Sequence, residues 1–273
     1  MLCAILKTMQ DKSQLLFYKS LPTGKEYIDF IFSKDSLKED KTLTLFKNDI
    51  ENKSFQTYET VGDLMGILYK LSTCGYGCRG GSHTIEYISG RAYNLSISAL
   101  KLLRIGFYDE ALSLIRSISE IINLFCLFRI DTSSYEDWLK CSTKDRIYKY
   151  TPSKVRKKLT DLNVTAPVSF EYYSKLCETG VHVTPETKPS GYNEHSLALV
   201  GGFVIEHAPS AILNDLANNI FFLILMASSC ILPKDKFMEL TEVLKTYENK
   251  IGGLNIENLE EHIAKVKKKS KKN

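Results

Sequence analysis

Three residues that often bind metal ions, Cys74, Cys78 and His83, lie close together in the segment TCGYGCRGGSH, residues 73–83. Thiolate sulfur and imidazole nitrogen are ligands that Zn²⁺ prefers in proteins. The spacing Cys-x3-Cys-x4-His supplies only three ligands, and no second Cys or His pair follows at the distance found in zinc fingers. From this spacing we expect no metal ion and no other cofactor.

The same segment contains the pattern G-x-G-x-x-G, formed by Gly75, Gly77 and Gly80. In a dinucleotide-binding fold this pattern follows a β-strand, precedes a helix, and is followed about 20 residues later by an acidic residue. Here the preceding VGDLMGILYKL has apolar residues at helical spacing, and the chain shows no alternation of strands and helices. The pattern instead predicts a glycine-rich turn between two helices, with Ser82 capping the second one.

A second set of candidate residues lies on a long apolar segment, 108–129, that has helical periodicity. Arg116 and Glu120 are the only charged residues between positions 111 and 128, and they share one side of the predicted helix with Asn123. The opposite side is a broad apolar face, formed by Ala111, Leu114, Ile115, Ile118, Ile121, Ile122 and Phe125. We therefore predict a central helix that is packed on most of its circumference and carries one polar seam.

Two interpretations of this polar seam remain open. An exposed Arg–Glu pair four residues apart contributes only about 0.3–0.5 kcal/mol. A buried pair needs further partners, because desolvating each charge costs several kcal/mol; His182, Tyr172 and Tyr173 are the candidates. The seam is therefore either a structural polar core or a functional crevice, since perturbed ionisable groups occur in both.

Basic residues are concentrated in two segments of the chain. Residues 140–158 contain eight Lys or Arg residues and one acid, and residues 265–273 contain six lysines and no acid, although the whole chain has a net charge of only +4. Tyrosines interleave with the bases of the first segment, which favours stacking on unpaired RNA bases together with phosphate contacts. The candidate RNA-binding residues are Arg146, Tyr148, Lys149, Lys154, Arg156, Lys157 and Lys158. A solvated basic surface is the alternative.

The elements that must position these residues are predicted to be helical from about residue 61 onward. Periodicity and capping signals predict an all-α antiparallel bundle, with helices over 61–72, 82–104, 108–129, 134–141, 152–161, 168–179, 196–231, 234–249 and 256–269. The first 60 residues show no sustained period, and the strand-like KEYIDFIF and KTLTLF predict a small irregular region or β-hairpin. The predicted units are an N-terminal embellishment (1–60), a bundle (61–250), and a C-terminal helix with a lysine-rich tail (251–273).

The composition favours a cytoplasmic globular protein. Hydrophobic residues make up 44% and charged residues 25% of the chain, which are ordinary values for a folded domain. The seven cysteines are odd in number and scattered, which argues against a disulfide framework and for a reducing compartment. The most apolar run, residues 220–232, is shorter than the roughly 20 residues of a membrane span. It predicts a buried helix, and we expect no membrane partner.

The order of three segments, GFYDEALSLIRSISEI, YTPSKVRKKL and YYSKLCETGVHVTPET, resembles bacterial helical families grouped with the HEPN (higher eukaryote and prokaryote nucleotide-binding) superfamily. The resemblance covers about residues 80–235, and it implies a HEPN-like helical bundle and a role among RNA-cleaving toxins or phage-defence components. The matching positions are Arg116, Glu120 and His182. The RNA-cleaving members carry an Arg followed after four to six residues by a His, and no arginine here has a histidine at that distance.

Two functional hypotheses follow. In the first, the protein acts on nucleic acid as a toxin or phage-defence effector, and the resemblance implies that Arg116 holds a phosphate, Glu120 orients Arg116, and His182 serves as acid or base. In the second, the chain is a non-catalytic interaction or scaffold module, often a homodimer, in which the same three residues are structural. RNA binding across a salt series distinguishes the two, because phosphate contacts make affinity fall steeply with salt.

Overall fold

The computed structural model of the chain describes residues 23–33, 35–78, 80, 82–182, 201–206 and 208–251. Within these residues the regular secondary structure is entirely helical, so the predicted all-α fold is confirmed. The chain first forms α3 (Gly24–Phe32), α4 (Asp35–Asn48), α5 (Ser54–Ser72), α6 (Thr84–Arg104) and α7 (Tyr108–Ile130). It continues with α8 (Thr132–Lys140), α9 (Thr143–Lys149), α10 (Pro152–Asp161), α11 (Phe170–Gly180), α12 (Ala208–Ile231), α13 (Lys234–Lys245) and the 3-10 helix η1 (Glu248–Lys250).

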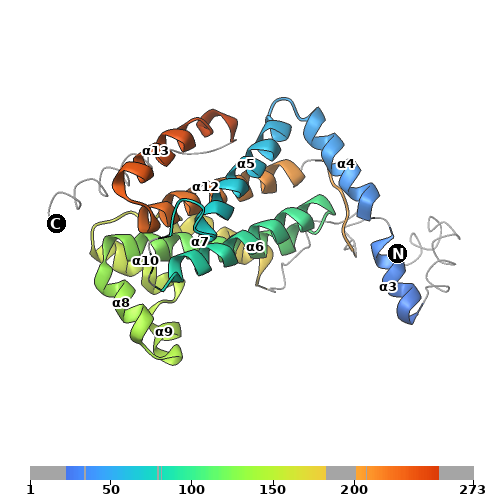
Figure 1. Cartoon of the computed structure of the whole chain (residues 1–273). Helices are drawn as coiled ribbons and strands as arrows, with labels where there is room; N and C mark the ends of the chain where they lie inside the picture. The colour runs from blue at the N-terminus through green and yellow to red at the C-terminus, as the bar shows by residue number, and fades with distance from the viewer. Residues whose placement is uncertain are drawn as a thin grey trace, which may run out of the picture.

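The hydrophobic core forms around α12 and α7. Helix α12 packs against α7, α5 and α6, and α7 also packs against α6, α10 and α11 (Figure 1). The apolar run in α12 is buried as predicted, because residues such as Phe221 and Ile224 have no exposed surface. In α7, Ala111 and Ile118 on one side and Leu127 on the opposite side are all fully buried. The prediction of a central helix packed on most of its circumference is therefore confirmed.

The two core helices are also long and apolar enough to cross a membrane. Each of α7 and α12 contains an 18-residue stretch of high mean hydropathy, and 61% and 72% of these stretches are buried inside the protein. Packing in the core accounts for their apolar composition, because a central helix of a folded bundle passes the same test of length and hydropathy. The two helices are thus weak evidence for a membrane span.

The β-hairpin predicted near the N-terminus is wrong for the described residues. The segment KEYIDFIF lies in α3, and KTLTLF lies in α4. In α4 the side chains of Thr42 and Phe46, one helical turn apart, are both fully buried. The Thr42 hydroxyl also donates to the carbonyl oxygen of Arg104 at 2.9 Å. Packing of a helical face against the bundle has therefore overridden the β propensity of this segment.

The predicted helix boundaries agree with the structure best in the middle of the chain. From residue 82 to residue 161, the predictions match α6, α7, α8 and α10 to within two residues at each end. Helix α9 was not predicted, because its seven residues are too few to show a hydrophobic period. The predicted boundary at residue 60 falls inside α5. The predicted helix 256–269 lies outside the described residues.

The turn between α6 and α7 is built on Gly106, whose φ of +82° favours glycine. An added Cβ at this position would overlap the backbone of Phe203, and the Phe203 N–H donates to the Gly106 carbonyl oxygen at 3.2 Å. The hydroxyl of Tyr108 accepts a hydrogen bond from the Ile205 N–H at 3.1 Å. The segment that precedes α12 is thus anchored to the turn that makes α6 and α7 antiparallel.

Candidate functional site

Arg116 and Glu120 form an ion pair on one side of α7, with Arg116 Nη2 lying 2.8 Å from Glu120 Oε1. Tyr173, on the facing helix α11, completes a triangle with this pair. Its hydroxyl lies 2.6 Å from Arg116 Nη2 and donates to Glu120 Oε1 at 2.8 Å. Arg116 Nε donates to the sulfur of Cys177, one turn further along α11, at 3.2 Å. Helix α11 therefore covers the polar seam, and Tyr173 is one of the partners suggested by the sequence.

The triangle of Arg116, Glu120 and Tyr173 is partly buried, with 25% of the arginine side chain and 32% of the glutamate side chain exposed. Burial raises the pKa of the Tyr173 hydroxyl above its ordinary value, and the hydrogen bond to Glu120 acts in the same direction. Burial opposes the charge of Arg116, but the bond to Cys177 and the charge of Glu120 outweigh it, so the pKa of Arg116 is raised. Tyr173 therefore stays protonated and Arg116 stays charged near neutral pH.

His182, the third residue of the predicted catalytic group, lies just beyond the end of α11 and is exposed. Its backbone N–H donates to the carbonyl oxygen of Cys177 at 2.9 Å. Cys177 thus contacts two of the predicted residues, Arg116 through its sulfur and His182 through its carbonyl oxygen. The structure brings Arg116 and Glu120 together; catalysis by these two with the His182 imidazole stays a prediction.

A second arginine, Arg156 of α10, connects this cluster to the basic segment. Its Cζ lies 4.6 Å from the centroid of the Tyr173 ring, and the Cζ of Arg116 lies 5.2 Å from the same centroid. Arg156 also lies over the ring of Phe170, at 5.4 Å. Its Nη1 is buried and has no hydrogen-bond partner among the described residues. Tyr173 therefore joins two candidate sites that the sequence presented separately.

An open pocket of about 740 Å³ lies beside Arg156, between α10, α11 and the loop that joins them. Its lining includes Lys157, Phe170 and Glu171. Phe170 is 61% exposed. The pKa of Glu171 is lowered by its own backbone N–H and by the hydroxyl of Ser169, so this residue is a carboxylate at neutral pH. The pocket thus combines two cations, an aromatic ring and a hydrogen-bond acceptor.

Phe170 is the residue of this pocket that sequence reasoning missed. The sequence places it within a predicted helix, where an aromatic residue is usually part of the core. In the structure it is the first residue of α11, directly after the N-cap Ser169. At this position the side chain projects from the helix end into the pocket beside α10, and no local pattern indicates its exposure.

The other predicted RNA-binding residues divide into two groups. Arg146 and Lys149 hold the small helices together, because Arg146 Nε donates to the Trp138 carbonyl oxygen at 2.8 Å and Lys149 pairs with Asp137 at 3.0 Å. Lys158 also turns toward α8, where it donates to a serine hydroxyl at 3.4 Å.

Lys154 and Tyr148 form the second group, in which the side chains remain accessible. Lys154 Nζ lies 3.2 Å from the centroid of the Tyr148 ring, and 70% of the Tyr148 side chain is exposed. Lys157 is exposed as well. Together with Arg156 and with Phe170 of α11, these residues form an accessible surface next to the pocket.

Tyr172, which the sequence also suggested as a partner for Arg116, lies in a different polar cluster. Its hydroxyl donates to Asp215 Oδ1 at 3.2 Å and accepts a hydrogen bond from Asn219 Nδ2 at 2.8 Å. Burial raises the pKa of Asp215, while the hydrogen bond from Tyr172 acts against this increase. This cluster fastens α11 to α12 and so fixes the helix that carries Tyr173.

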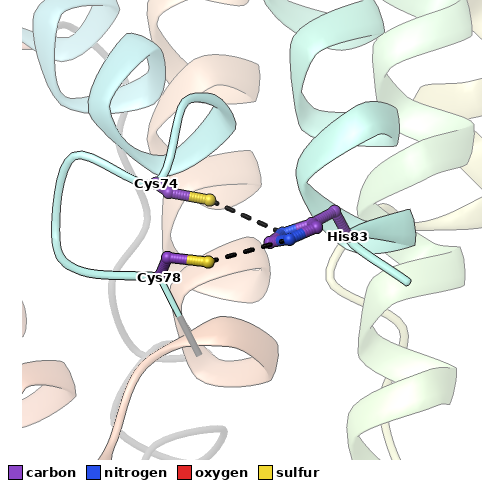
Figure 2. Close-up of side chains that lie close together, drawn as sticks. All are labelled: Cys74, Cys78 and His83. Carbon is purple, nitrogen blue, oxygen red and sulfur yellow. Dashed lines mark hydrogen bonds between the residues drawn. The ribbon is translucent and has the colours of Figure 1, made fainter. Parts of the chain in front are cut away.

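The loop between α5 and α6 brings together the cysteine and histidine side chains of the glycine-rich segment. Cys74 Sγ lies 3.5 Å from His83 Nδ1, and Cys78 Sγ lies 3.7 Å from His83 Nε2 (Figure 2). The predicted interhelical turn is confirmed. The predicted cap is wrong, because the residue before α6 is His83, with φ +50°, and the Ser82 hydroxyl instead contacts the hydroxyl of Thr84 at 2.8 Å.

Comparisons with known proteins found no match to this chain. No protein-family model, no curated protein and no solved structure matches it. The HEPN resemblance therefore rests on the sequence motifs alone.

The Tyr173→Phe variant is expected to lower the free energy of unfolding by about 1–2 kcal/mol, because two hydrogen bonds to charged groups are lost from a half-buried site. The measurement is urea denaturation at neutral pH. Tyr148→Phe is the matched control and is expected to change stability by less than about 0.5 kcal/mol, because its ring is largely exposed. Equal effects of the two substitutions would show that the Tyr173 hydroxyl does not stabilise the seam.

Proposed function

We propose that this protein binds single-stranded RNA at the pocket between α10 and α11. The observation that carries the proposal is the exposed ring of Phe170 next to two cationic side chains, Arg156 and Lys157, in one open pocket. Single-stranded nucleic acids are bound by this combination, in which an aromatic ring stacks on a base and cations neutralise the adjacent phosphates.

Each group in the pocket has a distinct role in this proposal. Phe170 stacks on one base, and Lys157 pairs with a phosphate beside it. The carboxylate of Glu171 accepts a hydrogen bond from a ribose 2′-hydroxyl, which favours RNA over DNA. The guanidinium group of Arg156 is held in place by the rings of Phe170 and Tyr173. Its buried Nη1 has no acceptor among the described residues, and we propose that the RNA supplies one.

Lys154 and Tyr148 extend the proposed surface beyond the pocket. The Tyr148 ring is accessible to a second base, and the ammonium group of Lys154 over this ring is positioned for the next phosphate. Because two bases and two phosphates are contacted, binding is expected to be sequence-tolerant and to depend strongly on salt.

The test is fluorescence anisotropy of a labelled single-stranded RNA over a series of salt concentrations. The wild type is expected to bind, and the logarithm of its association constant is expected to fall with the logarithm of salt concentration. Lys157→Glu is expected to reduce that slope by at least about 0.7, the value for one phosphate contact on a single strand. Phe170→Ala is expected to weaken binding about 5- to 150-fold, from a stacking contribution of about 1–3 kcal/mol.

Lys41→Glu provides the matched control for charge. Lys41 is exposed on α4, which lies at the opposite end of the bundle from α10 (Figure 1). This variant has the same net charge as Lys157→Glu but leaves the pocket intact. Absence of RNA binding at low salt, or equal effects of the two charge reversals, would rule out this site. Tighter binding of DNA than of RNA would contradict the role given to Glu171.

Cleavage of the bound RNA is a separate proposal, in which Arg116, Glu120 and His182 act together. The observation that favours it is that His182 lies two residues beyond the end of α11, the helix whose Tyr173 and Cys177 contact Arg116. The same incubations, analysed on a denaturing gel, give the test. Products formed by the wild type but not by His182→Ala would establish catalysis, whereas intact RNA with both proteins supports a binding module without catalysis.

A further inference from the structure

We propose that Cys74, Cys78 and His83 bind a Zn²⁺ ion that joins the end of α5 to the start of α6. The spacing of these residues alone predicted no metal ion, but the folded loop brings their potential ligand atoms together. One potential ligand atom from each residue lies within 4.8 Å of those of the other two. Figure 2 shows both sulfurs pointing at the imidazole ring of His83 from the same side.

Each sulfur lies as far from a ring nitrogen as two ligands of a tetrahedral site lie from each other. With Zn–S bonds of about 2.3 Å and Zn–N bonds of about 2.0–2.1 Å, tetrahedral angles place sulfur and nitrogen ligands roughly 3.6 Å apart. The two sulfur–nitrogen distances in the structure are 3.5 and 3.7 Å. The sulfurs lie beside different ring nitrogens, so a rotation of the His83 side chain is required to present one nitrogen to the ion.

The position of Glu86 indicates which nitrogen binds. Glu86 Oε1 lies 3.5 Å from His83 Nδ1, one turn into α6. Histidines that bind metal ions commonly donate their second ring N–H to a carboxylate, which fixes the orientation of the ring. We therefore assign Nε2 as the ligand atom and Nδ1–H as the donor to Glu86. Glu86 is then a positioning residue and not a ligand.

The backbone of the loop favours the same arrangement. The N–H of Gly80 donates to Cys78 Sγ at 3.4 Å, and such a bond stabilises negative charge on a thiolate. Cys74 and His83 both have left-handed φ values, +56° and +50°, which are unfavourable for residues with a side chain. With this backbone conformation, the side chains of Cys74 and His83 point toward each other.

The loop is also fixed to the rest of the bundle. Lys236 of α13 donates to the carbonyl oxygen of Tyr76 at 2.9 Å, between the two cysteines. Two thiolates and one imidazole select Zn²⁺ over Mg²⁺ or Ca²⁺, which prefer oxygen ligands. Three protein ligands leave a fourth position for water or an external ligand.

The test uses the full chain, with its thiols kept reduced by a phosphine, and Co²⁺ as a spectroscopic substitute for Zn²⁺. The wild type is expected to develop the visible bands of tetrahedral cobalt and the ultraviolet band of thiolate coordination, with saturation at one ion per chain. Added Zn²⁺ is expected to abolish both. Cys78→Ser is expected to lose the thiolate band or lower it substantially; because Cys78 is exposed, this variant is expected to fold.

Cys141→Ser is the matched control, since it removes a cysteine from a different part of the fold, and it is expected to retain the bands. Glu86→Ala is expected to retain the shape of the spectrum but to bind about 10- to 100-fold more weakly, as for other residues that orient a metal ligand. Absence of the bands in reduced wild type, or identical spectra for Cys78→Ser and Cys141→Ser, would overturn the proposal. Unchanged affinity in Glu86→Ala would overturn the assignment of Nε2.

Discussion

The Phe221→Ala variant is expected to lower the free energy of unfolding by about 3–5 kcal/mol. Phe221 has no exposed surface and lies in α12, the helix that packs against α5, α6 and α7. Its ring also packs edge to face against Phe222, with the ring centroids 5.8 Å apart and the planes at 83°. Truncation removes the buried ring and leaves a cavity that the surrounding helices fill only in part.

Urea denaturation followed by circular dichroism measures this loss. The urea concentration at the unfolding midpoint is expected to fall, while the slope of the unfolding free energy against urea concentration stays the same. This combination indicates lower stability without a change in the unfolded state. Phe222→Ala is the matched control, and because Phe222 is only partly buried its loss is expected to be smaller. If the two variants lost equal stability, the complete burial of Phe221 would not account for its effect.

The Asn123→Ala variant is expected to lower the free energy of unfolding by about 2–6 kcal/mol, although it removes only a small polar group. Asn123 Nδ2 donates to the Val168 carbonyl oxygen at 3.0 Å, and the Val168 N–H donates to Asn123 Oδ1 at 2.9 Å. Both residues are buried, with 4% and 5% of their surfaces exposed. Alanine leaves a buried backbone donor and a buried acceptor unsatisfied, at about 1–3 kcal/mol each.

The same denaturation assay tests this prediction, with Asn94→Ala as the control. Asn94 is exposed on α6, so its replacement is expected to change stability by less than about 0.5 kcal/mol. Val168 lies two residues before Phe170, and the Asn123 variant is therefore also expected to weaken RNA binding. If Asn123→Ala lowered the free energy of unfolding no more than Asn94→Ala, the Asn123 side chain would not hold the loop between α10 and α11 in place.

Helical periodicity was sufficient to predict most of the fold. The apolar positions of residues 108–129 and 220–232 recur at helical spacing, and both segments form the helices of the core. The prediction failed at KTLTLF, where the residues favour a strand and only the packing of Thr42 and Phe46 against the bundle selects a helix. Local propensity was thus reliable where the hydrophobic period was long and misleading where it was short.

For the candidate sites, the sequence identified the polar seam and offered Tyr173 among several possible partners, but it did not indicate the contact with Arg156 or the role of Phe170. It marked Arg116 and Glu120 as a polar seam because they interrupt an apolar helix, and this requires only the pattern within one segment. Tyr173 and Arg156 meet this seam from helices far along the chain. Their meeting depends on how α7, α10 and α11 pack, which hydrophobic spacing does not specify.

The Cys74–Cys78–His83 cluster was decided by backbone geometry within a single loop. The three residues are close in sequence, and their spacing had indicated only a turn. Left-handed backbone at Cys74 and His83 directs the side chains toward each other. The residue types at these positions do not predict left-handed backbone, because glycine alone adopts it freely. At Cys74 and His83 the surrounding structure must impose it. The residue types of the sites are therefore a property of the sequence, whereas their assembly depends on helix packing at Arg116 and on the loop backbone at Cys74 and His83.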